Sequence, residues 1–390
     1  MRIKRNQKAN KSVSAKPKKP TRSVVAIIVL VSPLFADIGC QHIGPGTIVS
    51  DRLDYNKAVL TSWEQQTLLN IVRVRYHDVV SFVDVGSVSQ THSLMGTASA
   101  TLGATLNPWN IITSTLSPSL MGGGSTTDSP VIAYTPLTGA DFIRNLNVPL
   151  RPIEICNLIE SGYNPQLLMN MTMYSINEIK SDSQGENFFR GITSDEFINL
   201  TSAIQHAHRR SELSFQVQPG ASNEGAKIFM LIADKDENKP SEPCPQNPKD
   251  RADQCPVALI REKLHLRAAE TKFEIVAGSR RGNDNEIAVR TRTVIGAMIW
   301  LSYYVDAPGA VYEPMSKEEK LTGDDRPLKV ICAPKKPHGM FAAVQYNGNW
   351  FWIDPKHQNS KSSLIYLRIL LALADTGPKP PPPVLTIPVR

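Results

Sequence analysis

The sequence lacks the short motifs that mark the common enzyme classes. It contains no GxSxG nucleophile elbow, no Walker-type phosphate loop, no HExxH zinc motif and no strand–GxGxxG–helix unit. Gly122-Gly123-Gly124 is not followed by the lysine that a phosphate loop needs, so it is predicted to be a chain breaker. These absences favour a role without catalysis.

Histidines are few, and no spacing among them indicates a metal site. His206 and His208 are two residues apart on a predicted helix, about 200° around its axis, so they cannot both face one metal ion. His265 is predicted to lie in a strand, and His338 and His357 flank a predicted hairpin. We therefore expect neither a metal nor a cofactor.

Excess positive charge is confined to the N-terminus. The formal net charge of the whole chain is +7, but residues 1–23 alone carry nine Lys or Arg and no acidic residue. From residue 40 onward 34 basic residues face 35 acidic ones, a net charge of −1. A binding site for nucleic acid is therefore not expected.

The first 39 residues have the pattern of an export signal. The basic stretch is followed by an uncharged, mainly apolar run, Val24–Ala36, and then by Asp37-Ile38-Gly39-Cys40. As a helix that run would cover roughly 20 Å, less than the roughly 30 Å hydrocarbon core of a bilayer. Cleavage is therefore predicted over a permanent membrane span.

Gly39-Cys40 resembles the lipobox of bacterial lipoproteins, in which the cysteine is acylated and becomes the first mature residue. The resemblance predicts lipid attachment at Cys40. Asp37 stands where the family usually has an aliphatic residue, which leaves an uncleaved anchor or an unmodified secreted protein as alternatives. Gln41 follows the cysteine where lipoproteins retained in the inner membrane typically carry Asp, so the periplasmic side of the outer membrane is favoured.

The remaining cysteines are expected to play structural parts. Cys244 and Cys255 lie in a polar, Pro-rich stretch, and in an oxidising compartment we expect them to form a disulfide. Metal ligation is the alternative, although no further ligands lie nearby in the sequence. Cys156 and Cys332 lie in apolar surroundings typical of thiols in the core.

The pattern of elements predicts an α+β fold, in which an N-terminal, mostly helical part is followed by a mainly antiparallel sheet with packed helices. The predicted parts are a signal peptide (1–39), a tether (40–55), a mostly helical region (56–211), an α+β domain (212–377) and a Pro-rich tail (378–390). Helices are predicted at 56–77, 141–146, 152–161, 165–176, 193–210, 293–305 and 362–374. Strands are predicted at 79–85, 131–134, 213–218, 227–233, 259–268, 271–277, 286–291, 341–346 and 350–353.

Two loops are predicted to close hairpins. Asn347-Gly348 is the strongest hairpin signal of the sequence. The polar stretch Gly278–Asn285 is expected to join its flanking strands in the same way.

An insert at residues 86–130 differs in composition from the rest. Of its 45 residues 23 are Gly, Ser or Thr, and Asp128 carries its only formal charge. Ala and Leu alternate with Ser, Thr and Gly from Ala98 to Leu106, the period of a strand with one apolar face. The insert is predicted to be a loop or a strand pair on the soluble sheet, or, as an alternative, a hairpin that several copies assemble into an outer-membrane pore.

Three other sets of residues are weak candidates for chemistry. Asp354 follows an aromatic strand, where burial could raise its pKa, but Asp354-Pro355 is also an ordinary turn. Trp350 and Trp352 share one face of that strand and form a possible binding surface, although core packing is the commoner use. Arg280-Arg281 could meet an anionic group, but a solvated loop explains the pair as well.

Several segments resemble a group of predicted bacterial envelope lipoproteins that has no established activity. The segments are His42–Thr47, Asp51–Asn56, Leu68–Arg73 with Arg75-Tyr76, Tyr134–Gly139, Trp350–Asp354 and Pro383–Pro388. The resemblance spans nearly the whole mature chain and therefore implies one architectural unit. It carries over no catalytic residues.

The favoured hypothesis is a non-enzymatic lipoprotein of the cell envelope, structural or partner-binding, held on a membrane by its lipid. Its partner would be another envelope protein or further copies of the same chain. The alternatives are a periplasmic hydrolase that acts on envelope polymers and a lipoprotein that binds a small ligand or lipid near Trp350 and Trp352.

Overall fold

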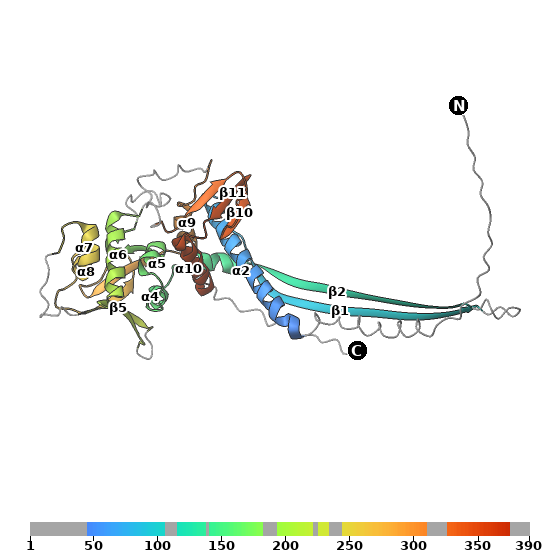
Figure 1. Cartoon of the computed structure of the whole chain (residues 1–390). Coiled ribbons are helices and arrows are strands. Elements are labelled where there is room, and N and C mark those ends of the chain that lie inside the picture. The colour runs from blue at the N-terminus through green and yellow to red at the C-terminus, as the bar shows by residue number, and fades with distance from the viewer. Residues whose placement is uncertain are drawn as a thin grey trace, which may run out of the picture. The chain divides into compact units, whose positions relative to one another are not determined.

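The computed structural model describes residues 45–105, 115–137, 140–181, 193–220, 225–233, 244–309 and 326–374 (Figure 1). The predicted signal peptide, Cys40 and the Pro-rich tail lie outside these residues. The chain divides into two units, Met1–Lys57 and Ala58–Arg390, and apart from the first part of α2 the account below concerns the second.

The fold is α+β, as the sequence predicts. The described helices are α2 (Pro45–Arg75), α3 (Ala140–Asn147), α4 (Pro152–Glu160), α5 (Pro165–Thr172), α6 (Asp195–Arg209), α7 (Pro248–Gln254), α8 (Pro256–Lys263), α9 (Val294–Ser302) and α10 (Gln358–Ala374). The described strands are β1 (Phe82–Thr105), β2 (Thr115–Leu137), β3 (Met173–Ile176), β4 (Ile179–Lys180), β5 (Leu213–Gln218), β6 (Lys227–Ile232), β7 (Lys272–Ala277), β8 (Glu286–Thr291), β9 (Val330–Ala333), β10 (Ala342–Tyr346) and β11 (Asn349–Ile353).

The largest sheet has six strands in the order β4-β3-β8-β7-β6-β5. Its pairs are antiparallel except for β7 and β8, which run parallel. The hairpin predicted across Gly278–Asn285 is therefore wrong. Those residues run back along β7, so that β8 enters in the same direction with Glu286 opposite Glu274.

The same sheet joins the two predicted regions. β3 and β4 come from the mostly helical region 56–211, whereas β5 to β8 come from the α+β region 212–377. One hydrophobic core spans both regions. The two regions therefore form one compact unit and are not separate bodies.

A smaller sheet, in the order β10-β11-β9, holds the predicted hairpin at Asn347-Gly348. Both turn residues have left-handed backbone, with φ of 47° and 78°, as this type of tight turn requires. The end of α2 packs on this sheet, where the Tyr76 ring meets Tyr346 and Phe351 at centroid distances of 5.5 and 6.2 Å.

Three further predicted segments differ from the structure. The tether is helical from Pro45, because proline suits the first turn of a helix and here begins α2. Residues 259–268 are not a strand: Pro256 begins α8, which buries Leu259 and Ile260 on one side, and His265 lies in a turn with φ of 51°. The helix predicted at 165–176 ends at Thr172 and continues as β3.

Cys244 and Cys255 form the disulfide that the sequence predicts, with their Cα atoms 5.9 Å apart. The bond holds the start of the helix pair α7 and α8, since Cys255 lies between the two helices. Cys156 is buried and Cys332 is half-buried, and both are free thiols.

Replacing both Cys244 and Cys255 with serine should lower the free energy of unfolding by about 2–3 kcal/mol, because the bond closes a short loop in the unfolded chain. Urea unfolding measures the change. A reductant should move the wild-type midpoint to that of the double variant and leave the variant unchanged. A wild-type midpoint that ignores the reductant would contradict the structural part given to this bond.

Candidate functional site

The described residues offer no assembled catalytic or metal centre. No group of three or more His, Cys, Asp or Glu side chains is placed to hold a metal within the described ranges. His206 contacts the Ala252 carbonyl and Asp253, whereas His208 contacts Glu160 at 3.3 Å, so the two histidines serve different neighbours. Both anchor α6 to adjacent elements.

His357 and Ser360 come closest to a nucleophile and base. His357 Nδ1 lies 2.7 Å from the Ser360 hydroxyl, and the Ser360 amide donates to the same nitrogen at 3.1 Å. The hydroxyl also accepts from the Lys329 amide at 2.8 Å. His357 is 5% exposed and Ser360 is fully buried, so the pair caps the start of α10 and ties it to the chain before β9.

Other residues that the sequence offers as candidates also form hydrogen bonds or ion pairs with nearby residues. Asp354 accepts from the Lys356 amide at 2.8 Å and therefore closes the turn after β11. Arg281 donates to the His265 carbonyl at 3.1 Å and pairs with Asp284 in its own loop, while Arg280 is exposed.

The aromatic strand β11 places its residues on two faces. Phe351 is fully buried, and Trp350 and Trp352 are half-buried on the opposite face. Lys336 lies 5.0 Å from the centre of the Trp350 ring. Trp350 helps to line an open pocket that also includes Gln65, Gln66 and Arg73.

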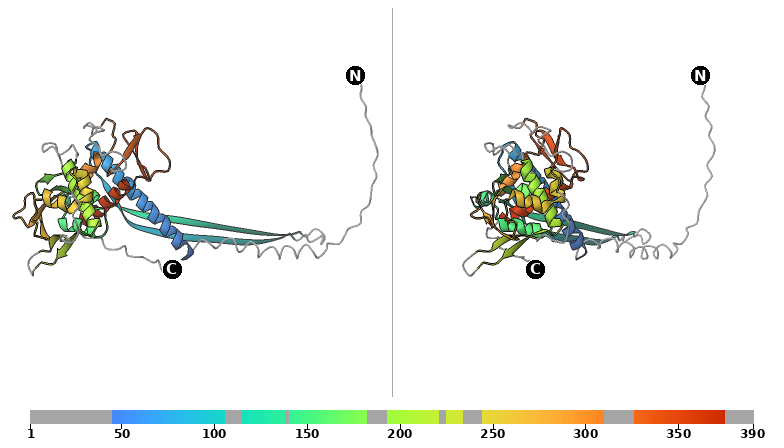
Figure 2. Two further views of the ribbon diagram at one scale, coloured as in Figure 1. Left: turned by 60° about the vertical axis from the view of Figure 1, so that its left-hand side comes forward. Right: turned by 90° about the vertical axis from the view of Figure 1, so that its left-hand side faces the viewer.

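The most extended feature is the hairpin of β1 and β2, which we call the arm. Its strands pair antiparallel from Phe82–Leu137 to Thr105–Thr115, with one bulge between Val85 and Ser87, and they lie side by side in each view (Figures 1 and 2). They form a separate two-stranded sheet within the described structure.

The register of the arm sorts its residues by polarity. Paired residues of an antiparallel ladder belong to the same face, and faces alternate along each strand. From 97 to 105 and from 115 to 123, one face takes Ala98, Ala100, Leu102, Ala104, Leu116, Pro118, Leu120 and Gly122. The other face takes Thr97, Ser99, Thr101, Gly103, Thr105, Thr115, Ser117, Ser119, Met121 and Gly123. The alternation seen in one strand is therefore continued by its partner.

The prolines of β2 agree with this register. In an antiparallel pair only alternate residues donate backbone hydrogen bonds to the partner strand, and proline cannot donate. Pro118, Pro130 and Pro136 are all separated by even numbers of residues, so all three fit positions that face away from β1. The ladder keeps its bonds, and the outer edge of β2 lacks three donors.

Two amide side chains of α2 hold the base of the arm, and we call them the amide clamp. The Gln66 side chain accepts from the Val83 amide at 2.7 Å and donates to the Val83 carbonyl at 3.1 Å. The Asn70 side chain accepts from the Ser81 amide at 2.9 Å and donates to the Ser81 carbonyl at 2.7 Å. Four helical residues rise about 6 Å and two strand residues about 6.6 Å, so the helix matches the edge of the strand.

Aromatic packing completes the base. Phe82, between the two clamped residues, is fully buried, with its ring centroid 6.1 Å from Trp63 and 5.9 Å from Phe142. Farther along the arm Tyr134 is 64% exposed. The hydrophobic core therefore holds the base of the arm, and the clamp fixes its direction relative to α2.

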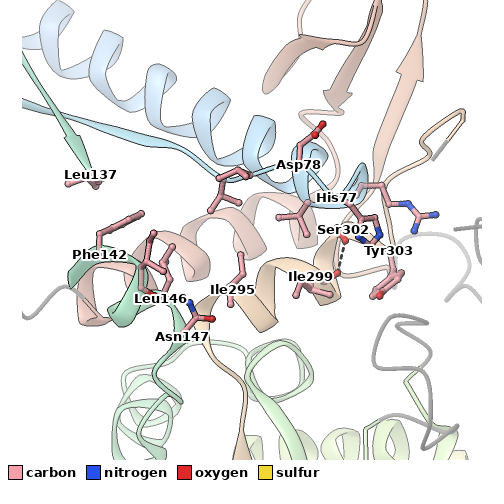
Figure 3. A pocket seen from close by; sticks show the side chains of 15 residues that line it. His77, Asp78, Leu137, Phe142, Leu146, Asn147, Ile295, Ile299, Ser302 and Tyr303 are labelled. Atoms are coloured by element: carbon pink, nitrogen blue, oxygen red, sulfur yellow. Dashed lines mark hydrogen bonds between the residues drawn. The ribbon is translucent and has the colours of Figure 1, made fainter. Parts of the chain in front are cut away.

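An apolar pocket of about 440 Å³ lies beside this base (Figure 3). Leu137, Phe142 and Leu146 lie at one end in the view, and His77 and Tyr303 lie at the other. Ile295 and Ile299 of α9 lie between them. Trp350 and Trp352 do not line this pocket, so it is distinct from the surface near those tryptophans that the small-ligand alternative names.

A buried cation borders the polar end of the pocket. Arg75 is 3% exposed and its guanidinium carbon lies 5.7 Å from the centre of the Tyr303 ring. Burial lowers the pKa of Arg75, and Tyr303, Tyr76 and Asp306 oppose that shift. At the rim, Val79 is 86% exposed and Ile143 is 59% exposed, so apolar surface continues outside the pocket.

Comparison with known proteins gives no relatives. No family model, curated protein or solved structure matches the chain.

No helix among the described residues is long and apolar enough to cross a membrane.

Replacing Asn70 with alanine should release the base of the arm. Asn70 is fully buried, and the change removes both side-chain bonds to Ser81 at a cost of about 1–3 kcal/mol. Hydrogen exchange of the peptide that contains Ser81 and Val83 should speed up. Gln65→Ala is the matched control, because Gln65 is exposed on the same helix. Equal exchange in both variants would show that the clamp does not hold the arm.

Proposed function

We propose that this chain is a non-enzymatic protein of the bacterial cell envelope, held on a membrane by a lipid on Cys40, and that it acts by presenting the arm to a binding partner. The observation that carries the proposal is the long β1–β2 pair clamped to α2. A two-stranded sheet has two strands with unpaired outer edges, which are ready to pair with another chain. The presence of this arm supports a structural or partner-binding role.

The composition of the arm supports binding over catalysis. Residues 86–130 carry only one formal charge, Asp128. The fixed base gives the arm a defined direction relative to α2, since Asn70 binds Ser81 just before β1 and Gln66 binds Val83 within it. A rigid base reduces the entropy lost when a partner binds.

A hydrolase that acts on envelope polymers receives less support. Ser360 and His357 would be its best nucleophile and base, but both are buried and the hydroxyl already accepts from Lys329. A substrate could not reach that oxygen without unfolding the cap of α10.

The envelope location rests on the leader and on the cysteines. The basic and apolar segments before Cys40 have the order of an export signal, and the Cys244–Cys255 disulfide suits an oxidising compartment. Gln41 after the modified cysteine favours the periplasmic face of the outer membrane.

Cys40→Ala should abolish both acylation and membrane association. In bacteria that express the full chain, wild-type protein should take up labelled palmitate and sediment with membranes, whereas the variant should take up no palmitate and should not sediment with membranes. Cys332→Ala is the matched control, because that half-buried thiol lies far from the leader in the sequence. Equal labelling of wild type and Cys40→Ala would contradict the lipid anchor.

A second function is favoured by the pocket beside the arm. Its volume of about 440 Å³ falls in the range of small-molecule sites, and its lining is mostly aliphatic and aromatic. An apolar ligand such as a fatty acid fits this chemistry, with its polar group toward Arg75 and Tyr303.

Ile299→Trp should fill the pocket and weaken the binding of an apolar fluorescent probe by roughly tenfold. Displacement of the probe by palmitate measures the binding. Ile365→Trp on α10 is the control, because Ile365 is 51% exposed and does not line the pocket. A probe that binds wild type and Ile299→Trp equally would remove this second function.

A further inference from the structure

The outer part of the arm combines three properties of a membrane-spanning strand pair. We define it as residues 97–105 of β1 with 115–123 of β2. It contains no charged residue, one of its faces takes the Ala, Leu and Pro residues, and the opposite face takes mainly Ser, Thr and Gly. Strands that separate lipid from a polar interior alternate in this manner.

The length of the outer part also fits a bilayer. The outer part has nine residue pairs in unbroken register, so each of its strands contributes nine residues. A membrane-spanning strand needs about 9–11 residues when it is tilted by about 45°. Toward the base, the uncharged character ends at the pair His92–Asp128. Four uncharged pairs separate that pair from the outer part, so the first charged residue toward the base lies outside the proposed spanning segment.

One hairpin cannot enter lipid alone. Each unpaired backbone group in hydrocarbon costs several kcal/mol, so the outer edges of β1 and β2 must pair with further strands. Further copies of the chain supply such strands, because β1 of one copy can pair with β2 of the next until the sheet closes. Pro118 removes one donor from the outer edge of β2 in this part, whereas Leu116, Leu120 and Gly122 keep theirs.

Resting on the proposed function, the register of the arm assigns its partner: we propose that the outer part spans the outer membrane as one hairpin of a closed homo-oligomeric sheet. The face with Ala98, Ala100, Leu102 and Ala104 contacts lipid acyl chains, and the face with Thr97, Ser99 and Thr101 lines a polar interior. The assembly is a pore component.

Site-by-site labelling of the lipidated full chain tests this proposal. Single cysteines at each position from 97 to 105, in a Cys332→Ser background, carry an environment-sensitive fluorophore in vesicles of phosphatidylethanolamine and phosphatidylglycerol. Buried Cys156 is not labelled, because burial raises the pKa of its thiol to about 12. Quenching by a lipid-borne quencher should be strong at 98, 100, 102 and 104 and weak at 97, 99, 101, 103 and 105.

Leu102→Asp and Thr101→Asp form a matched pair of adjacent residues on opposite faces. Leu102→Asp should abolish the detergent-stable oligomer and reduce dye release from vesicles by at least roughly tenfold, because a charge on the lipid face is costly at this depth. Thr101→Asp should leave both within about twofold of wild type.

The outcomes separate this proposal from the anchor. Quenching without a period of two, a monomer in detergent, or equal effects of the two Asp variants would overturn insertion while the lipid on Cys40 still holds the protein on vesicles. Insertion that requires an added soluble protein would assign the arm to that partner instead. Loss of vesicle binding in Cys40→Ala supports the lipid anchor. Insertion of the arm is then judged from the labelling pattern of the lipidated chain.

Discussion

The amide clamp between α2 and β1 is the interaction on which the rest of the structure depends. Gln66 and Asn70 are four residues apart on α2, and they bind the backbone of Val83 in β1 and of Ser81 just before it, which are two residues apart. Phe82 lies between the bound residues and is fully buried, which joins polar bonds and hydrophobic packing at one point. Without these contacts, the arm would be joined to the body by a flexible connection and would have no fixed direction relative to α2.

The second constraint is the alternation of faces in a β-strand. Residues of a strand whose side chains share one face also direct their backbone groups to the same edge of the strand. The register that collects Ala and Leu on one face therefore also directs the backbone nitrogens of Pro118, Pro130 and Pro136 to one edge. The two strands thus agree in polarity and in backbone chemistry. The compact body contributes a stable base through its core, and its polar side chains are used in caps and turns, as His357, Ser360 and Asp354 show.

Local signals were predictable from the sequence, and pairings across long distances were not. Asn347-Gly348 forces a tight turn through its left-handed backbone, Pro152 and Pro165 begin helices, and nearby cysteines form a disulfide. The apolar residues of the α8 segment occur at spacings that suit a strand as well as a helix, and Pro256 at its start decides for the helix. The parallel entry of β8 and the pairing of 97–105 with 115–123 depend on tertiary packing and on register, which no local pattern records. The amides of Gln66 and Asn70 did carry a signal, since two polar residues four apart interrupt an apolar helix face beside Leu69.

A cross-link measures the register of the arm directly. In a full chain with cysteines at 101 and 119, the paired positions Thr101 and Ser119 belong to one face and are directly opposite, at about the 5.5 Å Cα separation that a disulfide accepts. Mild oxidation should form this intramolecular bond quickly, whereas cysteines at 101 and 120, which belong to opposite faces, should stay reduced. Faster bonding of the second pair would shift the register by one residue, and the apolar face would no longer exist.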